Sequence, residues 1–246
     1  MNINTGCTLH RYLDVVPADV EDYEELARFH YRGNSLGPIR CRYKLIDHHP
    51  WRSQAAPVVG IIIYTAPSAN LAARNRATGG LFVGLDRSAA LNMLNERMSC
   101  IRRVIIEPRY RGLGLASRLV AETLPLCGTP MVEAVSIMGR VNPFFERAGM
   151  QAFVPKPDPK TERLRAAFEA VGLSETWIQR PECLHTAIEQ LDTSLKGLVI
   201  EEIQRFCQKF TNRRNSPHGP DRTAFVLGKL AEKPMYYLWM QSKSGR

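Results

Sequence analysis

Two arginines and two glycines stand close together in the segment 109–116, directly after an apolar stretch of the chain. Gly112 and Gly114 have no side chains, so successive backbone N–H groups can point into one concavity. A helix that begins at this point adds its positive N-terminal end, and Arg109 and Arg111 flank the turn. This combination predicts a cradle for a pyrophosphate group.

The cradle differs from two well-known phosphate-binding loops. It lacks the Gly-Lys-Ser/Thr ending of a Walker loop, and Ser117 stands where the dinucleotide fingerprint has its last glycine. An ordinary tight turn between a strand and a helix is the simpler alternative, and a lone Gly-x-Gly would favour it. The preceding strand, the two arginines and Ala116 favour the phosphate site instead.

Candidates for catalysis lie inside two apolar segments. Glu133 is the first choice for a general base, because burial makes a carboxylate a better proton acceptor. The alternative is a salt bridge between Glu133 and an arginine such as Arg102 or Arg103. These two arginines must point to opposite faces of one strand, so one guanidinium points inward and needs a partner, and we assign Arg103 to the site. Ser136 either lines the same cleft or bonds to the backbone.

Hydrophobic periodicity and turn residues divide the first 155 residues into strands and helices that must position these groups. Strands are expected at 8–16, 42–46, 57–66, 100–107, 131–138 and 150–154. Helices are expected at 20–31, 87–97, 114–126 and 142–148, with an irregular segment at 67–75.

The pattern changes beyond the proline-rich connector 155–159. Helical periodicity runs through 161–171, 181–195 and 198–210, a polar loop follows at 212–220, and 235–240 is strand-like. We therefore divide the chain into a domain at 1–155, a helical insertion or independent bundle at 156–234, and a returning strand with a tail at 235–246.

The composition of the 246 residues, 44% hydrophobic and 23% charged, is typical of a soluble globular protein. The longest apolar run is too short to span a bilayer, and the first residues lack the pattern of a secretory signal, so no membrane partner is expected. Six cysteines are scattered without a Cys-x-x-Cys pair. This spacing argues against a disulfide framework or a zinc site, and it predicts a cytoplasmic protein without a metal.

The net charge of +9 is concentrated in one part of the chain. Residues 26–118 contain fifteen Arg or Lys against four acids, and fourteen of those fifteen cations are arginine. The planar guanidinium of arginine suits phosphate better than the ammonium of lysine, so one interpretation is an arginine-rich face for DNA, RNA or another polyanion. A basic solvated face is the other interpretation.

The segment 104–116 resembles the signature of the GCN5-related N-acetyltransferases (GNAT), which is Arg/Gln-x-x-Gly-x-Gly/Ala after a strand ending in Val-x-Pro. A second family segment, Phe-Tyr-x-x-x-Gly-Phe, is similar to 144–150. The two segments follow the family's order, and the resemblance covers 9–154. It implies an α/β (α+β) fold with a mixed, mostly antiparallel central sheet, splayed strands and flanking helices, to which a helical C-terminal insertion or appendage is added.

The resemblance implies acetyl-CoA, or another acyl-CoA, as the cofactor, with its pantetheine between the splayed strands and its pyrophosphate on the loop. It implies a reaction in which an amine attacks the thioester while backbone N–H groups stabilise the oxyanion. The cofactor-binding residues that it implies are Val104, Ile105, Ile106, Arg109, Arg111, Gly112, Leu113, Gly114, Leu115, Ala116, Ser117 and Phe145.

Phe145 departs from the family pattern, which often has a tyrosine at this position to protonate the departing thiolate. A phenylalanine cannot donate a proton. Either another group or water does so, or the chemistry is not ordinary acetyl transfer.

The acceptor side is expected at the end of the helix 20–31, which in the family forms one wall of the acceptor pocket. The expected substrate residues are His30, Tyr31, Arg32 and Arg40, because such side chains suit stacking on a base and contact with phosphate. A helix end with a histidine stabilised by the helix dipole is the alternative.

Two looser resemblances concern parts of the domain at 1–155. The residues His30 and Tyr31, the strand at 57–66 and an arginine in the central strand are similar to the Mom-like phage DNA-modification proteins. The stretches 29–33 and 133–150 are similar to the acetyltransferase-like domain that is fused to some prokaryotic ABC-type ATPases.

These observations predict an acyl-CoA-dependent N-acyltransferase whose acceptor amine belongs to a nucleic-acid base or another polyanionic substrate. Two alternatives stay open. One is a small-molecule amine acetyltransferase whose arginines are incidental. The other is a catalytically inactive module that binds CoA or nucleic acid. The apolar positions of the C-terminal helices are expected to form a core or the contacts of a homodimer.

Overall fold

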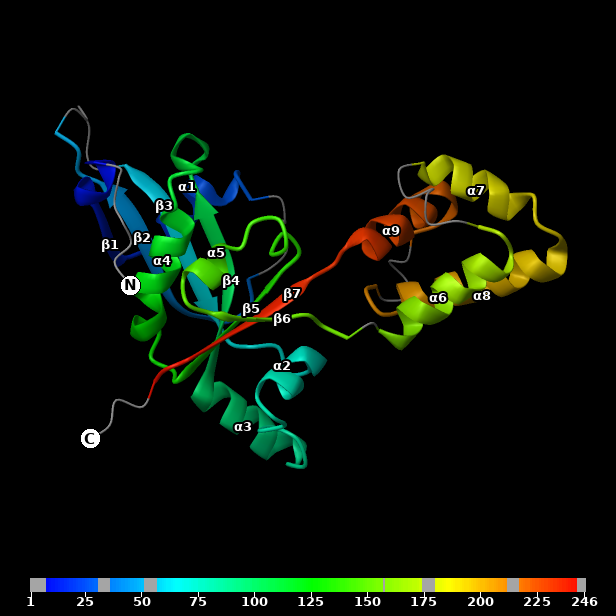
Figure 1. Cartoon of the computed structure of the whole chain (residues 1–246), viewed down its shortest axis with the longest axis horizontal. Helices are drawn as coiled ribbons and strands as arrows, with labels where there is room; N and C mark the ends of the chain where they lie inside the picture. The colour runs from blue at the N-terminus through cyan, green and yellow to red at the C-terminus, as the bar shows by residue number, and fades with distance from the viewer. Residues whose placement is uncertain are drawn as a thin grey trace. The chain divides into compact units, whose positions relative to one another are not determined.

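The structure of the chain, a computed structural model, describes residues 8–30, 36–50, 57–156, 158–173, 180–211 and 217–242. The chain divides into two units, one formed by Met1–Pro155 together with Pro234–Arg246 and the other by Lys156–Lys233. The first unit is built on a sheet, and the second consists of helices (Figure 1).

A seven-stranded sheet forms the first unit, with the strand order β1-β2-β3-β4-β5-β7-β6. All neighbouring strands are antiparallel except β4 and β5, which are parallel. This mixed, mostly antiparallel sheet with flanking helices confirms the predicted fold class. The strands are β1 (Leu13–Pro17), β2 (Ile39–Asp47), β3 (Val58–Thr65), β4 (Met98–Ile106), β5 (Met131–Ser136), β6 (Gln151–Phe153) and β7 (Met235–Met240).

Helices pack on both faces of the sheet. α4 packs on one face near Ile62 and Tyr64 of β3, and α1 packs on the other face near Ile61 and Ile63. Because β3 is buried on both faces, its sequence is a continuous apolar run and not an alternating one. The helices of this unit are α1 (Val20–Ala27), α2 (Ala72–Ala77), α3 (Arg87–Arg97), α4 (Leu115–Thr123) and α5 (Phe144–Arg147), with the 3-10 turns η1 (Thr8–Tyr12), η2 (Pro108–Tyr110) and η3 (Leu124–Leu126).

The second unit has an apolar core of its own. It is an insertion between β6 and β7, because these two paired strands both belong to the first unit. Its helices are α6 (Pro159–Ala170), α7 (Pro181–Glu189), α8 (Thr193–Cys207) and α9 (Gly219–Ala231). Among the helices that the structure describes, in either unit, none is both long and apolar enough to cross a membrane.

Three segments differ from the elements that the sequence predicts. The 3-10 turn η1 occupies the first half of the strand expected at 8–16. The short helix α2 lies where irregular chain is expected, because a buried side chain, Arg74, fixes it to the sheet. Helix α9 has no counterpart among the predicted helices, although a proline in its first turn is typical of a helix start.

Candidate functional site

β4 and β5 pair with each other over only four residue pairs, the last of which is Ile101↔Ala134. β4 then continues to Ile106 along β3, while β5 continues to Ser136 along β7. A β-bulge places Arg102 outside the register with β3 at the same point. In the described ranges, no strand pairs with the β5-facing edge of β4 beyond Ile101. A ligand can therefore bind this edge as an added strand would.

A cavity of about 490 Å³ lies at this open edge, and we call it the β4–α4 cleft. Its walls come from the end of β4, the loop and first turn of α4, the end of α1, and the segment after β5. The lining residues are Phe29, His30, Val104, Ile105, Ile106, Tyr110, Arg111, Gly112, Gly114, Leu115, Ala116, Ser117, Met138, Asn142, Phe144 and Arg147.

The loop before α4 has the backbone geometry of an anion cradle. Gly112 and Gly114 have φ angles of 83° and 77°, a conformation that side chains disfavour, and a Cβ at either position would meet open space. Among the described residues, no backbone N–H from Gly112 to Ser117 has a hydrogen-bond acceptor. The Ser117 hydroxyl is also buried without a partner in this part of the chain. Unsatisfied donors of this kind indicate a missing acceptor, such as a phosphate.

The two arginines of the loop have different surroundings. Arg111 lines the cleft and donates from Nε to the Ile106 carbonyl oxygen at 3.1 Å, so its guanidinium is fixed beside the cradle. The Arg109 side chain is 78% exposed and pairs with Glu107 at 2.8 Å. Arg109 does not line the cleft, and its expected cofactor contact stays a prediction. Arg147 lines the cleft and supplies a second cation there.

Phe145 and Leu113 pack into the core and not into the cleft. Phe145 is only 5% exposed, and its ring centroid lies 5.0 Å from that of Tyr237. The side chain that lines the cleft is its neighbour Phe144. Leu113 packs against the main core cluster of the sheet. The expected cofactor contact of the Phe145 side chain is therefore corrected, because the short helix α5 turns it inward. The expected contact of Leu113 is through its backbone N–H, and it stays a prediction.

Glu133 is the acidic half of a buried ion pair, which contradicts its expected role as a general base. The Arg74 guanidinium donates from Nη2 to Glu133 Oε1 at 2.7 Å and from Nε to Oε2 at 2.9 Å, and the Tyr236 hydroxyl donates to Oε2 at 3.0 Å. Arg74 and Glu133 are 2% and 1% exposed. With both oxygens occupied and no access to solvent, this carboxylate cannot take a proton from a substrate. The expected alternative, a salt bridge with an arginine, is confirmed, and the arginine is Arg74 and not one of the two examples, Arg102 and Arg103.

Burial also keeps the nearest thiol inert. It raises the pKa of Cys100, which is paired with Glu133 across β4 and β5, to about 12, and the charge of Glu133 adds to this effect. A thiol in this state stays protonated at neutral pH, which makes it a poor nucleophile.

The other predicted site residues are dispersed. Arg103 is buried and donates from Nη1 to the Arg102 carbonyl oxygen, so it is the inward-facing member of the pair. Ser136 is half-buried at the end of β5 and does not line the cleft. His30 lines the cleft at the end of α1. Tyr31 and Arg32 lie outside the described residues.

Arg40 is a structural residue, which corrects its expected contact with substrate. Its guanidinium donates to the Met98 carbonyl oxygen at 2.8 Å and to the Asn95 carbonyl oxygen at 2.6 Å, tying β2 to the junction of α3 and β4. Other arginines of the cation-rich stretch do the same. Arg42 donates to the Ala18 carbonyl oxygen, and Arg118 donates to those of His10 and Leu13. Much of the arginine excess is therefore used inside the fold.

No family model matches the chain, and no curated protein matches its sequence. One similar solved structure, at 15% identity and a TM-score of 0.34, is that of a candidate phosphinothricin N-acetyltransferase, and the match covers 59% of this chain and 89% of that one. Another, at 13% identity and a TM-score of 0.37, is a chain in a structure of the NatC complex bound to Gag peptide and CoA, with 58% and 86% covered. At such low similarity, the case for the site depends on the geometry of this chain alone.

The ion pair gives a prediction about stability. Glu133→Leu leaves the Arg74 guanidinium buried without its partner, so the free energy of unfolding should fall by about 3–5 kcal/mol. The double variant with Arg74→Met removes both charges and should recover most of that loss. Denaturant titration measures both effects. Arg87→Met, on the exposed start of α3, is the control and should change stability by less than about 0.5 kcal/mol. A loss for Glu133→Leu no larger than this control would contradict the ion pair.

Proposed function

We propose that the chain is an acyl-CoA-dependent N-acyltransferase whose donor binds in the β4–α4 cleft. The proposal depends on one observation. Two sets of backbone groups that lack hydrogen-bond partners among the described residues line the same cavity. The open edge of β4 can hydrogen-bond an extended amide-containing chain, and the loop from Gly112 to Ser117 can hold a pyrophosphate. Coenzyme A joins these two groups in one molecule, since its pantetheine arm carries amides and ends on a pyrophosphate.

The side chains of the cleft fit this donor. Arg111 and Arg147 bring positive charge to the cradle, and the Ser117 hydroxyl provides a further hydrogen-bonding group. Phe29 and Phe144 supply apolar walls, which exclude water and strengthen the polar contacts inside. When bound, acyl-CoA supplies an activated thioester carbonyl to an attacking amine. Backbone N–H groups on the free edge of β4 would then stabilise the oxyanion.

Proton transfer in the proposed reaction falls to His30. Glu133 is occupied by Arg74, and Phe145 is both buried and unable to donate a proton. His30 lines the cleft beside Phe29, in the chain that follows α1. Histidine is the side chain that exchanges protons near neutral pH, so we assign His30 the deprotonation of the acceptor amine. As the C–N bond forms and the C–S bond of the thioester breaks, the proton taken from the amine balances the CoA thiolate, which leaves as the thiol.

The acceptor is proposed only as an amine. A nucleic-acid base, as in the Mom-like proteins, would be favoured by free cations around the cleft, but several arginines of the cation-rich stretch bind carbonyl groups of the chain itself. We therefore favour a small-molecule amine, with nucleic acid as the competing acceptor. An inactive CoA-binding module is the remaining alternative, because Phe145 removes the usual proton donor.

The cradle is tested by Gly114→Val. A branched side chain above the first turn of α4 should block the amides of residues 115–117 and lower the affinity for CoA by about 100-fold, the equivalent of two lost hydrogen bonds to a charged group. Calorimetry with CoA measures the affinity. Gly128→Val is the matched control, because Gly128 also has a positive φ of 78° with open space around it, but lies at the far end of the α4 segment. Equal affinities in the two variants would refute the cradle.

Ser117→Ala separates binding from folding. Removing a buried hydroxyl that has no partner in the described structure should leave stability unchanged or slightly raised, because no native hydrogen bond is lost. Affinity for CoA should nevertheless fall by about tenfold if the hydroxyl bonds a phosphate. Thermal unfolding of the free protein and calorimetry with CoA give the two numbers. A drop in stability without a drop in affinity would make Ser117 a structural residue.

Turnover is tested by thiol release from acetyl-CoA, with small amines, peptides, and single- and double-stranded DNA and RNA as acceptors. His30→Gln should lower kcat/KM by about 10²–10⁴ and alter the pH profile, while its affinity for CoA stays near that of the unchanged protein. Acceleration by nucleic acid alone would favour the competing acceptor. Binding of CoA without thiol release from any acceptor would identify a binding module.

A further inference from the structure

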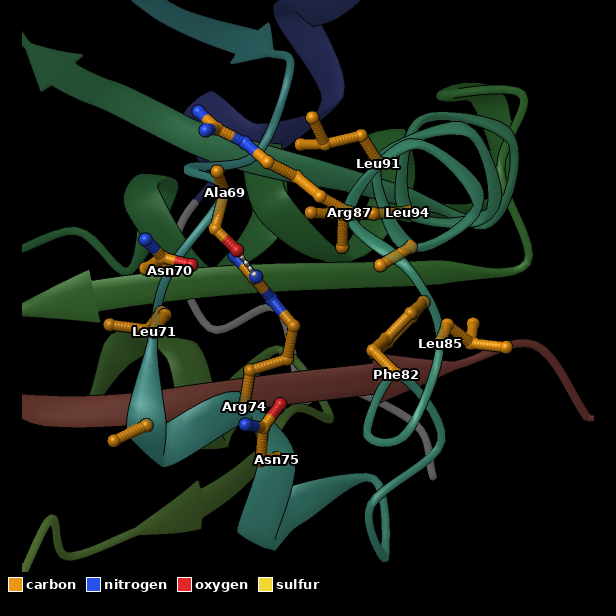
Figure 2. A pocket seen from close by; sticks show the side chains of 12 residues that line it. Ala69, Asn70, Leu71, Arg74, Asn75, Phe82, Leu85, Arg87, Leu91 and Leu94 are labelled. Carbon is orange, nitrogen blue, oxygen red and sulfur yellow. Dashed lines mark hydrogen bonds between the residues drawn. The ribbon is translucent and has the colours of Figure 1, made fainter.

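A second cavity, of about 700 Å³, lies between α2, α3 and the chain that connects them (Figure 2). It belongs to the opposite end of β4 from the β4–α4 cleft, because α3 ends where β4 begins. Its walls combine apolar and polar surface in similar amounts, and we call it the α2–α3 pocket. The large apolar residues that line it are Leu71, Phe82, Leu85, Leu91 and Leu94.

The floor of this pocket is a fixed and incompletely satisfied guanidinium. Arg74 is 2% exposed and donates to Glu133 and to the carbonyl oxygen of Ser68. Its Nη1 also donates to the Ala69 carbonyl oxygen at 3.3 Å (Figure 2). A guanidinium has five N–H groups, and these contacts use four. One N–H of Nη1 thus has no acceptor in the described part of the chain. The floor of the pocket is therefore polar.

The rim of the pocket carries a positive charge. Arg87, at the start of α3, is exposed and has neither an ion pair nor a hydrogen bond with any described residue. The neighbouring acid, Asp86, is occupied because its side chain accepts from the backbone N–H groups of Ser88 and Ala89. The side-chain amides of Asn70 and Asn75 also line the pocket. The pocket therefore combines apolar surface, neutral hydrogen-bonding groups, the guanidinium of Arg74 that is paired with Glu133, and the exposed guanidinium of Arg87.

We propose that the α2–α3 pocket is a second ligand site, which binds a small amphipathic carboxylate. The apolar body would lie between the leucines of α3 and Phe82, and the carboxylate would pair with Arg87. The planar fork of a single arginine matches one carboxylate, and the volume is within the range of small-molecule sites. The site does not depend on the proposed donor cleft, and it holds its ligand whether or not CoA is bound.

Calorimetry and ligand-observed NMR with octanoate and naphthalene-2-carboxylate test the proposal, with 1-octanol and octylamine as neutral and cationic probes. At least one carboxylate should bind saturably, and about tenfold or more tightly than the two control headgroups. Arg87→Glu should weaken carboxylate binding by about tenfold or more, because it replaces attraction by repulsion. Arg97→Glu makes the same charge change on the same helix outside the pocket, and should leave binding unchanged.

Three outcomes would overturn the proposal: no saturable binding of either carboxylate, equal binding of octanoate and 1-octanol, or equal losses in the Arg87→Glu and Arg97→Glu variants. Affinity for CoA is measured on the same variants and should not change in either one. Loss of carboxylate binding with intact CoA binding would separate the α2–α3 pocket from the β4–α4 cleft. A failure of CoA binding in the unchanged protein would leave the second site standing.

Discussion

The separation of β4 from β5 is the constraint on which the rest of the site depends. A strand edge without a partner leaves N–H and C=O groups unsatisfied, which is costly in a protein interior. Each strand here keeps its other neighbour, β3 for β4 and β7 for β5, so both stay extended after they part. The bulge at Arg102 and the ion pair between Arg74 and Glu133 lie beside the last paired residues, where they fix the point at which the strands diverge.

This arrangement assigns most of the binding to backbone groups. The free edge of β4 and the amides before α4 are donors and acceptors whose positions are set by the fold, so they need no reorganisation when a ligand arrives. Acidic side chains contribute little to ligand binding, since the carboxylate oxygens of Glu133 already accept hydrogen bonds from Arg74 and Tyr236. A buried charge is tolerated only with a close partner. The carboxylate in the middle of β5 therefore forms a structural ion pair and is not available for proton transfer. Proton transfer must then come from a residue at the margin of the cleft.

The sequence predicts the fold class and the cradle because both depend on local patterns. Strand and helix periodicity, and glycines that need positive φ, are readable over a few residues. The partner of Glu133 is not readable in this way, because Arg74 is 59 residues away and belongs to a helix of six residues without a clear apolar stripe. The order of Phe144 and Phe145 does not reveal which ring faces the cleft, since that depends on how α5 packs against Tyr237. The partners of Arg40 are backbone carbonyl groups, which every residue type has, so the sequence does not reveal them.

The two additions to the sheet differ in how they are joined to it. The helical unit between β6 and β7 has its own apolar core. The α2–α3 segment between β3 and β4 packs on the sheet through an apolar cluster that includes Phe82 and Leu94, and its Arg74 reaches Glu133 inside the sheet. The same guanidinium forms the floor of the α2–α3 pocket, and Glu133 pairs with Cys100 one residue before the strands separate. One ion pair therefore supports the floor of the second pocket and the base of the opening in which the donor is proposed to bind.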